Sequence, residues 1–106
     1  KKAVELGPKV NHAGPHRALG KLYLELPFFL GGDSDKSVFH LKEAVRLAPD
    51  YAENHLGLAQ VLVKKNNSNE ARESIHKLMQ LTDNTQDEKL ISLREEGIKL
   101  FAKLSP

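Results

Sequence analysis

The chain has 106 residues, of which 40% are apolar and 28% are charged, and its formal net charge is +2. This composition is typical of one globular domain or of a section of a longer array. A net charge so small and so evenly spread does not favour nucleic acid or an anionic membrane as a partner. The absence of cysteine excludes disulfides, thiolate metal sites and cysteine nucleophiles, and no apolar run approaches the ~18 residues of a membrane span.

The chain opens on a stretch that recurs further on. Residues 1–9 read KKAVELGPK, and residues 42–50 read KEAVRLAPD. Each copy has the pattern of the last turns of a helix that a proline ends, at Pro8 and at Pro49. We therefore interpret residues 1–8 as the tail of a truncated preceding repeat, and we expect the chain to be part of a longer array.

The first whole helix is predicted to begin at Pro15, which suits a first helical turn, and to end before Pro27. Gly20 lies inside it at a cost of roughly 1 kcal/mol relative to alanine. Such a glycine indicates the close approach of a neighbouring helix. The apolar residues fall at helical spacing on one side of this helix: Ala18, Leu19, Leu22, Tyr23 and Leu26.

Four more helices follow, predicted over residues 34–48, 51–65, 69–81 and 86–104. Asp33 and its polar neighbours offer caps for the helix that starts at residue 34. The last helix has an apolar stripe and a charged opposite face, which is the pattern of a capping helix at the end of a helical array. The stripe is Leu90, Leu93, Gly97, Phe101 and Leu104, and the charged face is Glu88, Lys89, Glu95, Lys99 and Lys103.

The central helices form two pairs that match each other. Their second helices match at an offset of 34 residues, which aligns Ser37 with Ala71. Their first helices match at an offset of 39, which aligns Tyr23 with Leu62. The difference of five residues places an insertion at residues 26–31. A helix–turn–helix unit of 34 residues has the length of a tetratricopeptide repeat (TPR).

The residues of the first pair resemble that family. Leu19-Gly20-x-x-Tyr23 is similar to the Leu-Gly-x-x-Tyr of its first helix. The small, bulky, alanine and proline positions of its second helix are met by Ser37, Leu41, Ala44 and Pro49.

The second pair, over residues 50–82, fits the same frame through Leu58-Ala59-x-x-Leu62 and Ala71…Ile75…Leu78. His16 and His55 stand where the family prefers tryptophan, and no proline follows Leu81. The resemblance covers nearly all of residues 1–82. It implies an all-α fold of antiparallel helix-turn-helix repeats in a right-handed superhelix, with repeats over residues 12–49 and 50–82 and a C-terminal capping helix over residues 86–104.

A narrower resemblance concerns the first repeat. The run from Gly14 to Tyr23, followed by Leu-Pro, an apolar loop and Gly-Gly-Asp, resembles the repeat of the T-component proteins associated with bacterial tripartite (TRAP) transporters. Those are TPR-like periplasmic lipoproteins that associate with a substrate-binding subunit. The run is also similar to TPR-like regulators of microtubule dynamics. Localisation therefore stays open between the cytoplasm and the bacterial periplasm.

The insertion carries Phe28, Phe29 and Leu30. Each of these side chains would lose about 1.5–3 kcal/mol of favourable burial free energy if it were left exposed. We therefore expect this loop to pack against another protein surface. One interpretation is that it folds over its own helix pair and extends the core. The other is that it docks on a partner or on a second copy of the chain, which would make the protein a homo-oligomer.

Five histidines invite a search for catalytic or metal chemistry. His12 and His16 are four residues apart, but Pro15 and the helix start lie between them, and no Cys, Asp or Glu completes a ligand set within one turn. His16 and His55 occupy equivalent core positions of the two repeats, whereas His40 and His76 are expected on the helix surface. We predict no enzyme activity, no cofactor and no metal.

Arrays of this family bind partners on a concave surface lined by the first helix of each pair. Arg17 and Lys21 are four residues apart there, so they could share a carboxylate of a partner; the alternative is a solvated basic face. The asparagine that completes a carboxylate clamp in some members is replaced by Gly57. The residues expected on the concave surface are Arg17, Lys21, Leu24, Glu25, Glu53, Gln60 and Lys64.

The sequence leaves three possible functions open. The first is a protein-interaction module, a scaffold or adaptor that binds a protein or peptide partner on its concave surface. The second is an accessory component of a bacterial TRAP-type transporter, which would bind a partner subunit or a small organic ligand. The third is a structural spacer without a binding site.

Overall fold

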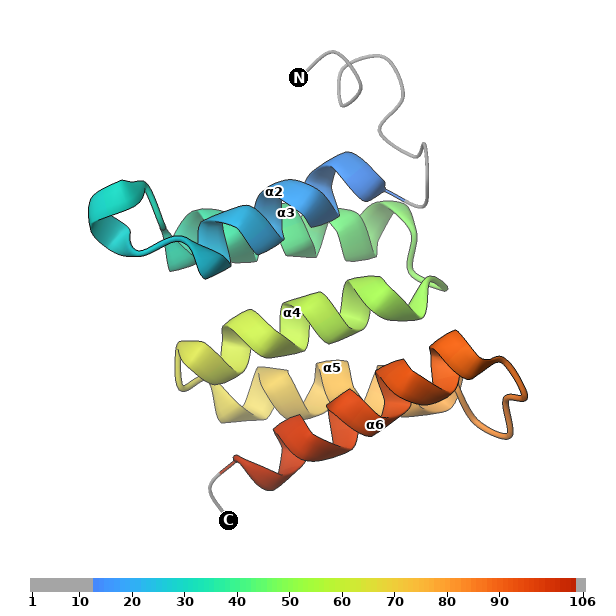
Figure 1. Cartoon of the computed structure of the whole chain (residues 1–106). Helices are drawn as coiled ribbons and strands as arrows, with labels where there is room; N and C mark the ends of the chain where they lie inside the picture. The colour runs from blue at the N-terminus through green and yellow to red at the C-terminus, as the bar shows by residue number, and fades with distance from the viewer. Residues whose placement is uncertain (1–12, 105–106) are drawn as a thin grey trace.

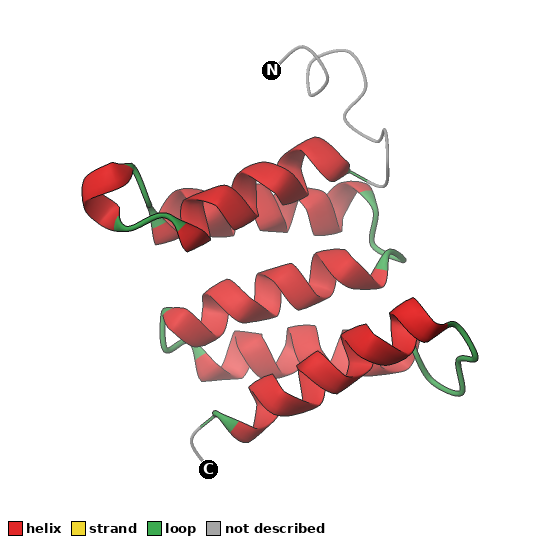
Figure 2. Cartoon of the chain, in the orientation of Figure 1, coloured by secondary structure: helices red, strands yellow, loops and turns green. Residues whose placement is uncertain are grey.

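The computed structural model describes residues 13–104, so the helix tail expected at residues 1–8 and His12 lie outside the described residues. The described part is entirely helical (Figures 1 and 2). Its elements are α2 (Gly14–Glu25), the short 3₁₀ helix η1 (Phe28–Leu30), α3 (Ser34–Leu47), α4 (Ala52–Lys64), α5 (Ser68–Leu81) and α6 (Glu88–Ala102). The all-α prediction is confirmed. Both ends of each predicted helix in the described range lie within two residues of the observed ends.

Local sequence signals set the ends of the helices. The Asp33 carboxylate accepts hydrogen bonds from the backbone N–H groups of Asp35 and Lys36 at 3.0 and 3.1 Å, and so caps α3. Asp87 caps α6 in the same way, through the N–H groups of Lys89 and Leu90. Pro27 and Pro49 follow the ends of α2 and α3, where a proline cannot continue the helical hydrogen bonds.

The helices stack in two antiparallel pairs, α2 with α3 and α4 with α5, and α6 lies against the second pair (Figure 1). In the view of Figure 1, α2, α4 and α6 lie in front of α3 and α5. α4 is in contact with each of the other four α-helices. It is therefore the centre of the described part of the chain.

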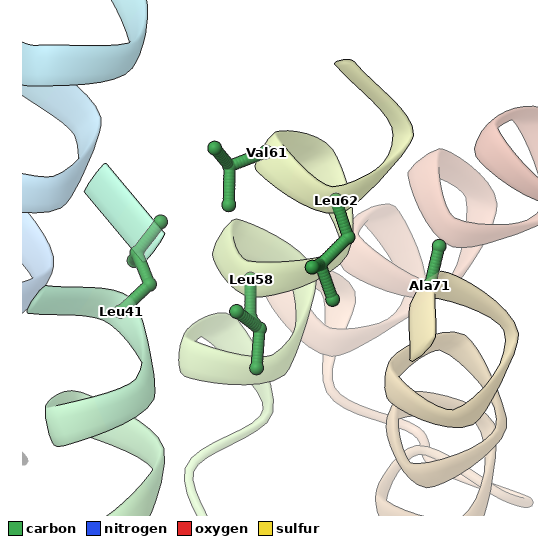
Figure 3. Packing of buried hydrophobic residues seen from close by; sticks show 5 residues of the cluster. All are labelled: Leu41, Leu58, Val61, Leu62 and Ala71. Carbon is green, nitrogen blue, oxygen red and sulfur yellow. The ribbon is translucent and has the colours of Figure 1, made fainter. Parts of the chain in front are cut away.

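Two apolar clusters form the core. One joins α3, α4 and α5 through Leu41, Leu58, Val61, Leu62 and Ala71 (Figure 3). The other joins α4, α5 and α6 through Ala52, Leu56, Leu78 and Leu93. The expected close approach at Gly20 is observed, because a Cβ at that position would stand 2.5 Å from Leu41 Cγ.

The core interpretation of the two repeat-equivalent histidines is confirmed, since His16 and His55 are both buried. His55 Nε2 donates to the carbonyl oxygen of Pro49 at 2.7 Å, and burial lowers the pKa of this imidazole. The surface position expected for His40 was wrong. Its ring stacks on Tyr23 at 5.8 Å and its Nδ1 lies 3.1 Å from that of His16, so it packs between α2 and α3.

The insertion does not extend the core of its own helix pair. Phe28, Phe29 and Leu30 are 87%, 73% and 61% exposed. Backbone hydrogen bonds close the segment on itself, because Leu30 and Gly32 both donate to the Pro27 carbonyl oxygen at 2.9 and 3.0 Å. In this tight turn the rings of Phe28 and Phe29 are exposed to solvent. They lie edge to face, with their centres 6.0 Å apart.

The capping pattern expected for α6 also needs correction. Leu93 and Gly97 are buried, but Phe101 is 53% exposed and Ile98 is 54% exposed. Leu100 packs against the second cluster instead of Phe101. Gly97 lies close to Leu78 of α5, and Phe101, four residues later, lines an open groove beside α5. The outer face of α6 is therefore not uniformly charged.

Candidate partner-binding surface

The residues expected to bind a partner lie on α2 and α4, and α6 packs against α4 beside them. A small pocket of about 90 Å³ lies where these three helices meet. Three of the predicted residues, Lys21, Glu53 and Gln60, line it together. The pocket is completed by Leu56, Gly57, Leu93 and Glu96.

Arg17 lies beside this pocket but is directed into the protein. Its Nη1 donates to Asn54 Oδ1 at 2.9 Å, its Nε lies 3.9 Å from Glu53 Oε2, and its guanidinium lies 4.9 Å from the centre of the Tyr51 ring. Its side chain is only 16% exposed. These contacts direct the Arg17 charge toward groups of α4 and its N-cap, rather than toward an acceptor shared with Lys21.

Asn54 explains why Arg17 takes this position. The Asn54 side chain is fully buried, and its amide nitrogen donates to the carbonyl oxygens of Ala44 and Ala48 at 3.2 Å each. It thereby adds a second donor to two carbonyl groups at the end of α3, which also accept backbone hydrogen bonds from the N–H groups of Ala48 and Tyr51. Arg17 completes the arrangement from α2, so this polar network joins three helices.

Glu53 bridges the helices that form the surface. Besides Arg17, it pairs with Lys89 of α6 at 3.4 Å, and the Tyr51 hydroxyl lies 3.5 Å from its carboxylate. The negative charge of Glu53 raises the pKa of the Lys89 ammonium. Lys89 was expected only on the charged outer face of the last helix, and its position here depends on how α6 packs against α4.

Three polar side chains of the pocket have no such partners. Lys21, Gln60 and Glu96 make no hydrogen bond or ion pair with any residue of the range 13–104. Beneath them lie the buried side chains of Leu56 and Leu93. The arrangement offers a cation, an amide and a carboxylate around a small apolar floor.

The remaining predicted residues lie apart from the pocket. Leu24 packs against the first core cluster instead of facing outward, and its carbonyl oxygen accepts a hydrogen bond from Lys64 Nζ at 3.1 Å. Glu25 is exposed at the end of α2, near the insertion.

Sequence reasoning missed four residues of this surface: Asn54, Leu56, Leu93 and Glu96. A polar residue amid the apolar positions of α4 was the signal for Asn54. Leu93 and Glu96 were missed because the last helix was treated as a cap.

The described range contains no group of three or more His, Asp or Glu side chains placed to hold a metal ion. None of the helices in residues 13–104 combines the length and the apolar character needed to cross a membrane.

Comparison with protein-family models gives a match over the centre of the chain. A model described as tetratricopeptide repeat matches residues 29–93, which is more than half of the chain. The searches of curated proteins and of solved structures returned no match.

Proposed function

The chain belongs to the tetratricopeptide repeat family, and we propose that it binds a segment of a partner polypeptide on the surface formed by α2, α4 and α6. The family supports a protein-interaction module in general. The observation that carries the choice of surface is the set of Lys21, Gln60 and Glu96, whose polar groups have no partner within the described range. Other polar groups nearby, such as those of Arg17 and Glu53, are engaged within the fold.

The pocket suggests the chemistry of the bound segment. At about 90 Å³, the pocket suits a single side chain of the bound segment. An aliphatic side chain of the partner would cover Leu56 and Leu93. An acidic group would lie toward Lys21 and a basic group toward Glu96, because opposite charges across an interface favour one orientation over its reverse.

The first experiment is a pull-down from native extract with the protein as bait. Any partner that is recovered is then tested against charge-reversed variants. We expect Lys21→Glu with Glu96→Lys to weaken its binding by about tenfold or more, since each change removes one favourable pair and introduces a repulsion. Glu25→Lys is the matched control, because it also reverses a charge on α2 but lies outside the pocket.

Arg17→Glu is a poor probe of the same surface. It would place a carboxylate against Asn54 Oδ1 and Glu53, and the resulting loss of fold would imitate a loss of binding. Unchanged binding by the folded Lys21→Glu, Glu96→Lys variant would show that the partner does not bind at this pocket.

The identity of the partner separates the two functional classes. Recovery of a solute-binding or transporter subunit would favour the transport-accessory function that the first repeat suggests. Recovery of an unrelated protein would favour a scaffold or adaptor. In either outcome the charge-reversed variants test the same surface.

A further inference from the structure

Two histidines face each other across the first helix pair. His16 of α2 and His40 of α3 bring their Nδ1 atoms to 3.1 Å, with their ring centres 5.3 Å apart. His16 is buried, and the rings of Tyr23 and Phe39 border that of His40 at 5.8 and 5.2 Å between centres. We refer to these two histidines as the histidine pair. It is not part of the pocket around Lys21, so a role for it goes beyond the function proposed above.

The short distance limits how many protons the histidine pair can hold. At 3.1 Å the two ring nitrogens form a hydrogen bond, in which one carries the proton and the other offers a lone pair. A neutral imidazole has one N–H group and one lone pair, whereas a protonated imidazole has two N–H groups and no lone pair. The hydrogen bond therefore survives when both rings are neutral and when one ring is protonated. A second proton would set two N–H groups and two positive charges face to face.

Glu43 is the carboxylate beside the histidine pair. It lies one turn after His40 on α3, near enough to both rings to interact with their charge. Both of its oxygens accept hydrogen bonds from Arg46, and these hydrogen bonds lower the pKa of Glu43. Its negative charge therefore favours a first proton on the histidine pair. Because it already balances a guanidinium, it does not offset a second one.

The other charged groups of the packed helices do not favour a second proton either. Lys36 of α3 holds its ammonium 5.5 Å from the centre of the Tyr23 ring, on which His40 stacks. Arg17 follows His16 on α2, and its guanidinium is directed toward Glu53 of α4. The nearby cations thus add to the repulsion, and the Glu53 carboxylate is engaged with Arg17 and Lys89.

The place of the histidine pair makes its charge matter to the fold. α2 and α3 lie side by side as the first helix pair (Figure 1). The buried residues of α2 are His16 and Gly20, and Gly20 is the one that meets Leu41 and Ser37 of α3. One of the two buried residues that hold α2 is therefore titratable. Repulsion within the histidine pair acts directly on the contact between α2 and α3.

We propose that the histidine pair is a proton-sensitive contact, which binds one proton, refuses the second, and so loosens α2 from α3 on acidification. A free imidazole titrates near pH 6.5, so below that pH the unfolded chain binds a proton on each of these rings. The folded pair binds one proton between them. The state that binds more protons gains as the pH falls. The stability that the histidine pair contributes is therefore present above about pH 6.5 and is lost below it.

His55 acts in the same direction and has to be separated from the histidine pair. It stands at the equivalent position of α4, where burial lowers the pKa of its imidazole. Its protonation at low pH therefore also costs stability. Variants that test the histidine pair leave His55 in place, so its contribution cancels between them and the wild-type chain.

The direct test is a titration of the ¹⁵N-labelled full chain, followed through its imidazole nitrogens by NMR from pH 7.5 to pH 5. We expect one ring of the histidine pair to carry its proton on Nδ1 and the other on Nε2 at the higher pH. We expect the two rings to take up a single proton between them while the chain stays folded. Full protonation of both rings in the folded chain would overturn the proposal.

A variant measures the effect on stability. His40→Gln removes one titrating ring and leaves an amide oxygen that can accept a hydrogen bond from His16. Between pH 7.5 and pH 5.5, we expect the unfolding equilibrium constant of the wild-type chain to rise about tenfold more than that of His40→Gln. His76→Gln is the matched control, because His76 is an exposed histidine of α5, and it should keep the wild-type pH dependence. Equal pH dependence in the wild-type chain and in folded His40→Gln would overturn the proposal.

Amide hydrogen exchange locates the loosening. At pH 5.5 we expect the amides of α2 to exchange faster in the wild-type chain than in His40→Gln, and those of α5 to exchange alike. Equal exchange of α2 in the two chains would overturn the proposal. If His40→Gln does not fold, the NMR titration of the wild-type chain decides by itself.

Discussion

The two helix pairs share one frame but build their cores differently. α4 of the second pair has nine buried residues, mostly aliphatic, whereas α2 of the first pair has two, His16 and Gly20. The interior of the first pair includes polar and aromatic contacts, among them the His16–His40 contact and the Tyr23–His40 stack. The interior of the second pair is mainly a set of leucine, valine and alanine side chains.

The position in the array accounts for this difference. α4 is packed between α3, α5 and α6 and also touches α2, so nearly all of its circumference is covered. α2 has contacts only with α3 and α4 among the described helices. The same repeat frame therefore buries most of the helix in the middle of the stack, where the polar Asn54 and His55 are hydrogen-bonded, and buries much less of the helix at its side. Four changes test this comparison.

The largest effect is expected at Leu41, which serves both pairs. It is fully buried in α3 and receives Gly20 of α2 on one side and Gly57 of α4 on the other. We expect Leu41→Ala to lower the free energy of unfolding by about 2–5 kcal/mol, through lost burial and the cavity left between the pairs. Chemical denaturation followed by circular dichroism measures it. Leu22→Ala is the control, because Leu22 is half exposed on α2. It should change the free energy of unfolding by about 0.5 kcal/mol or less. A loss below 1 kcal/mol for Leu41→Ala would mean that the pairs do not depend on this shared side chain.

The next effect concerns the close approach within the first pair. An alanine at position 20 would bring its Cβ to 2.5 Å from Leu41 Cγ. We expect Gly20→Ala to cost about 1–3 kcal/mol of stability through overpacking. The sharper test is a double-mutant cycle. With Leu41→Ala present, the obstructing side chain is gone, so the combined loss should be smaller than the sum of the two single losses. An additive result would show that Gly20 is not required by its contact with Leu41.

A smaller effect separates the two second helices at one position. Ser37 of the first pair donates from its hydroxyl to the Gly20 carbonyl oxygen at 2.7 Å, whereas the second pair has Ala71 at the equivalent place. We expect Ser37→Ala to cost about 0.5–1.5 kcal/mol, the net contribution of one hydrogen bond. Ser92→Ala on the exposed side of α6 is the matched control. If Ser37→Ala stabilised the protein, the polar interior of the first pair would be dispensable.

The smallest effect on stability is expected where the first pair differs most from the second, at the insertion. Because Phe28 and Phe29 are largely exposed, Phe28→Ser with Phe29→Ser should change the free energy of unfolding by about 0.5 kcal/mol or less. Sedimentation velocity of the same variant tests the predicted self-association through this loop. A large drop in melting temperature would contradict the exposed position. A wild-type chain that stays monomeric would contradict the self-association.

The helices and their ends followed from local signals. Apolar spacing alone predicts helices over residues 51–65 and 69–81, close to the observed α4 and α5. Prolines and aspartate caps act within one turn of the residue that carries them. The period of 34 residues and the Leu19-Gly20-x-x-Tyr23 pattern also indicated the family, which the family model confirms. Within the candidate surface, three of the seven predicted residues line one pocket.

Local sequence patterns are therefore enough to predict each helix, the repeat and the apolar side of each helix, because these depend on neighbours within a turn or one repeat. Which apolar residues are covered and which charges are paired depends instead on how the helices pack. Phe101 lies at an open edge and Arg17 reaches Asn54 because of where α5 and α4 stand. Helical spacing gives the direction of a side chain from its own axis, but the group that meets it belongs to another helix, whose position depends on packing across the whole stack.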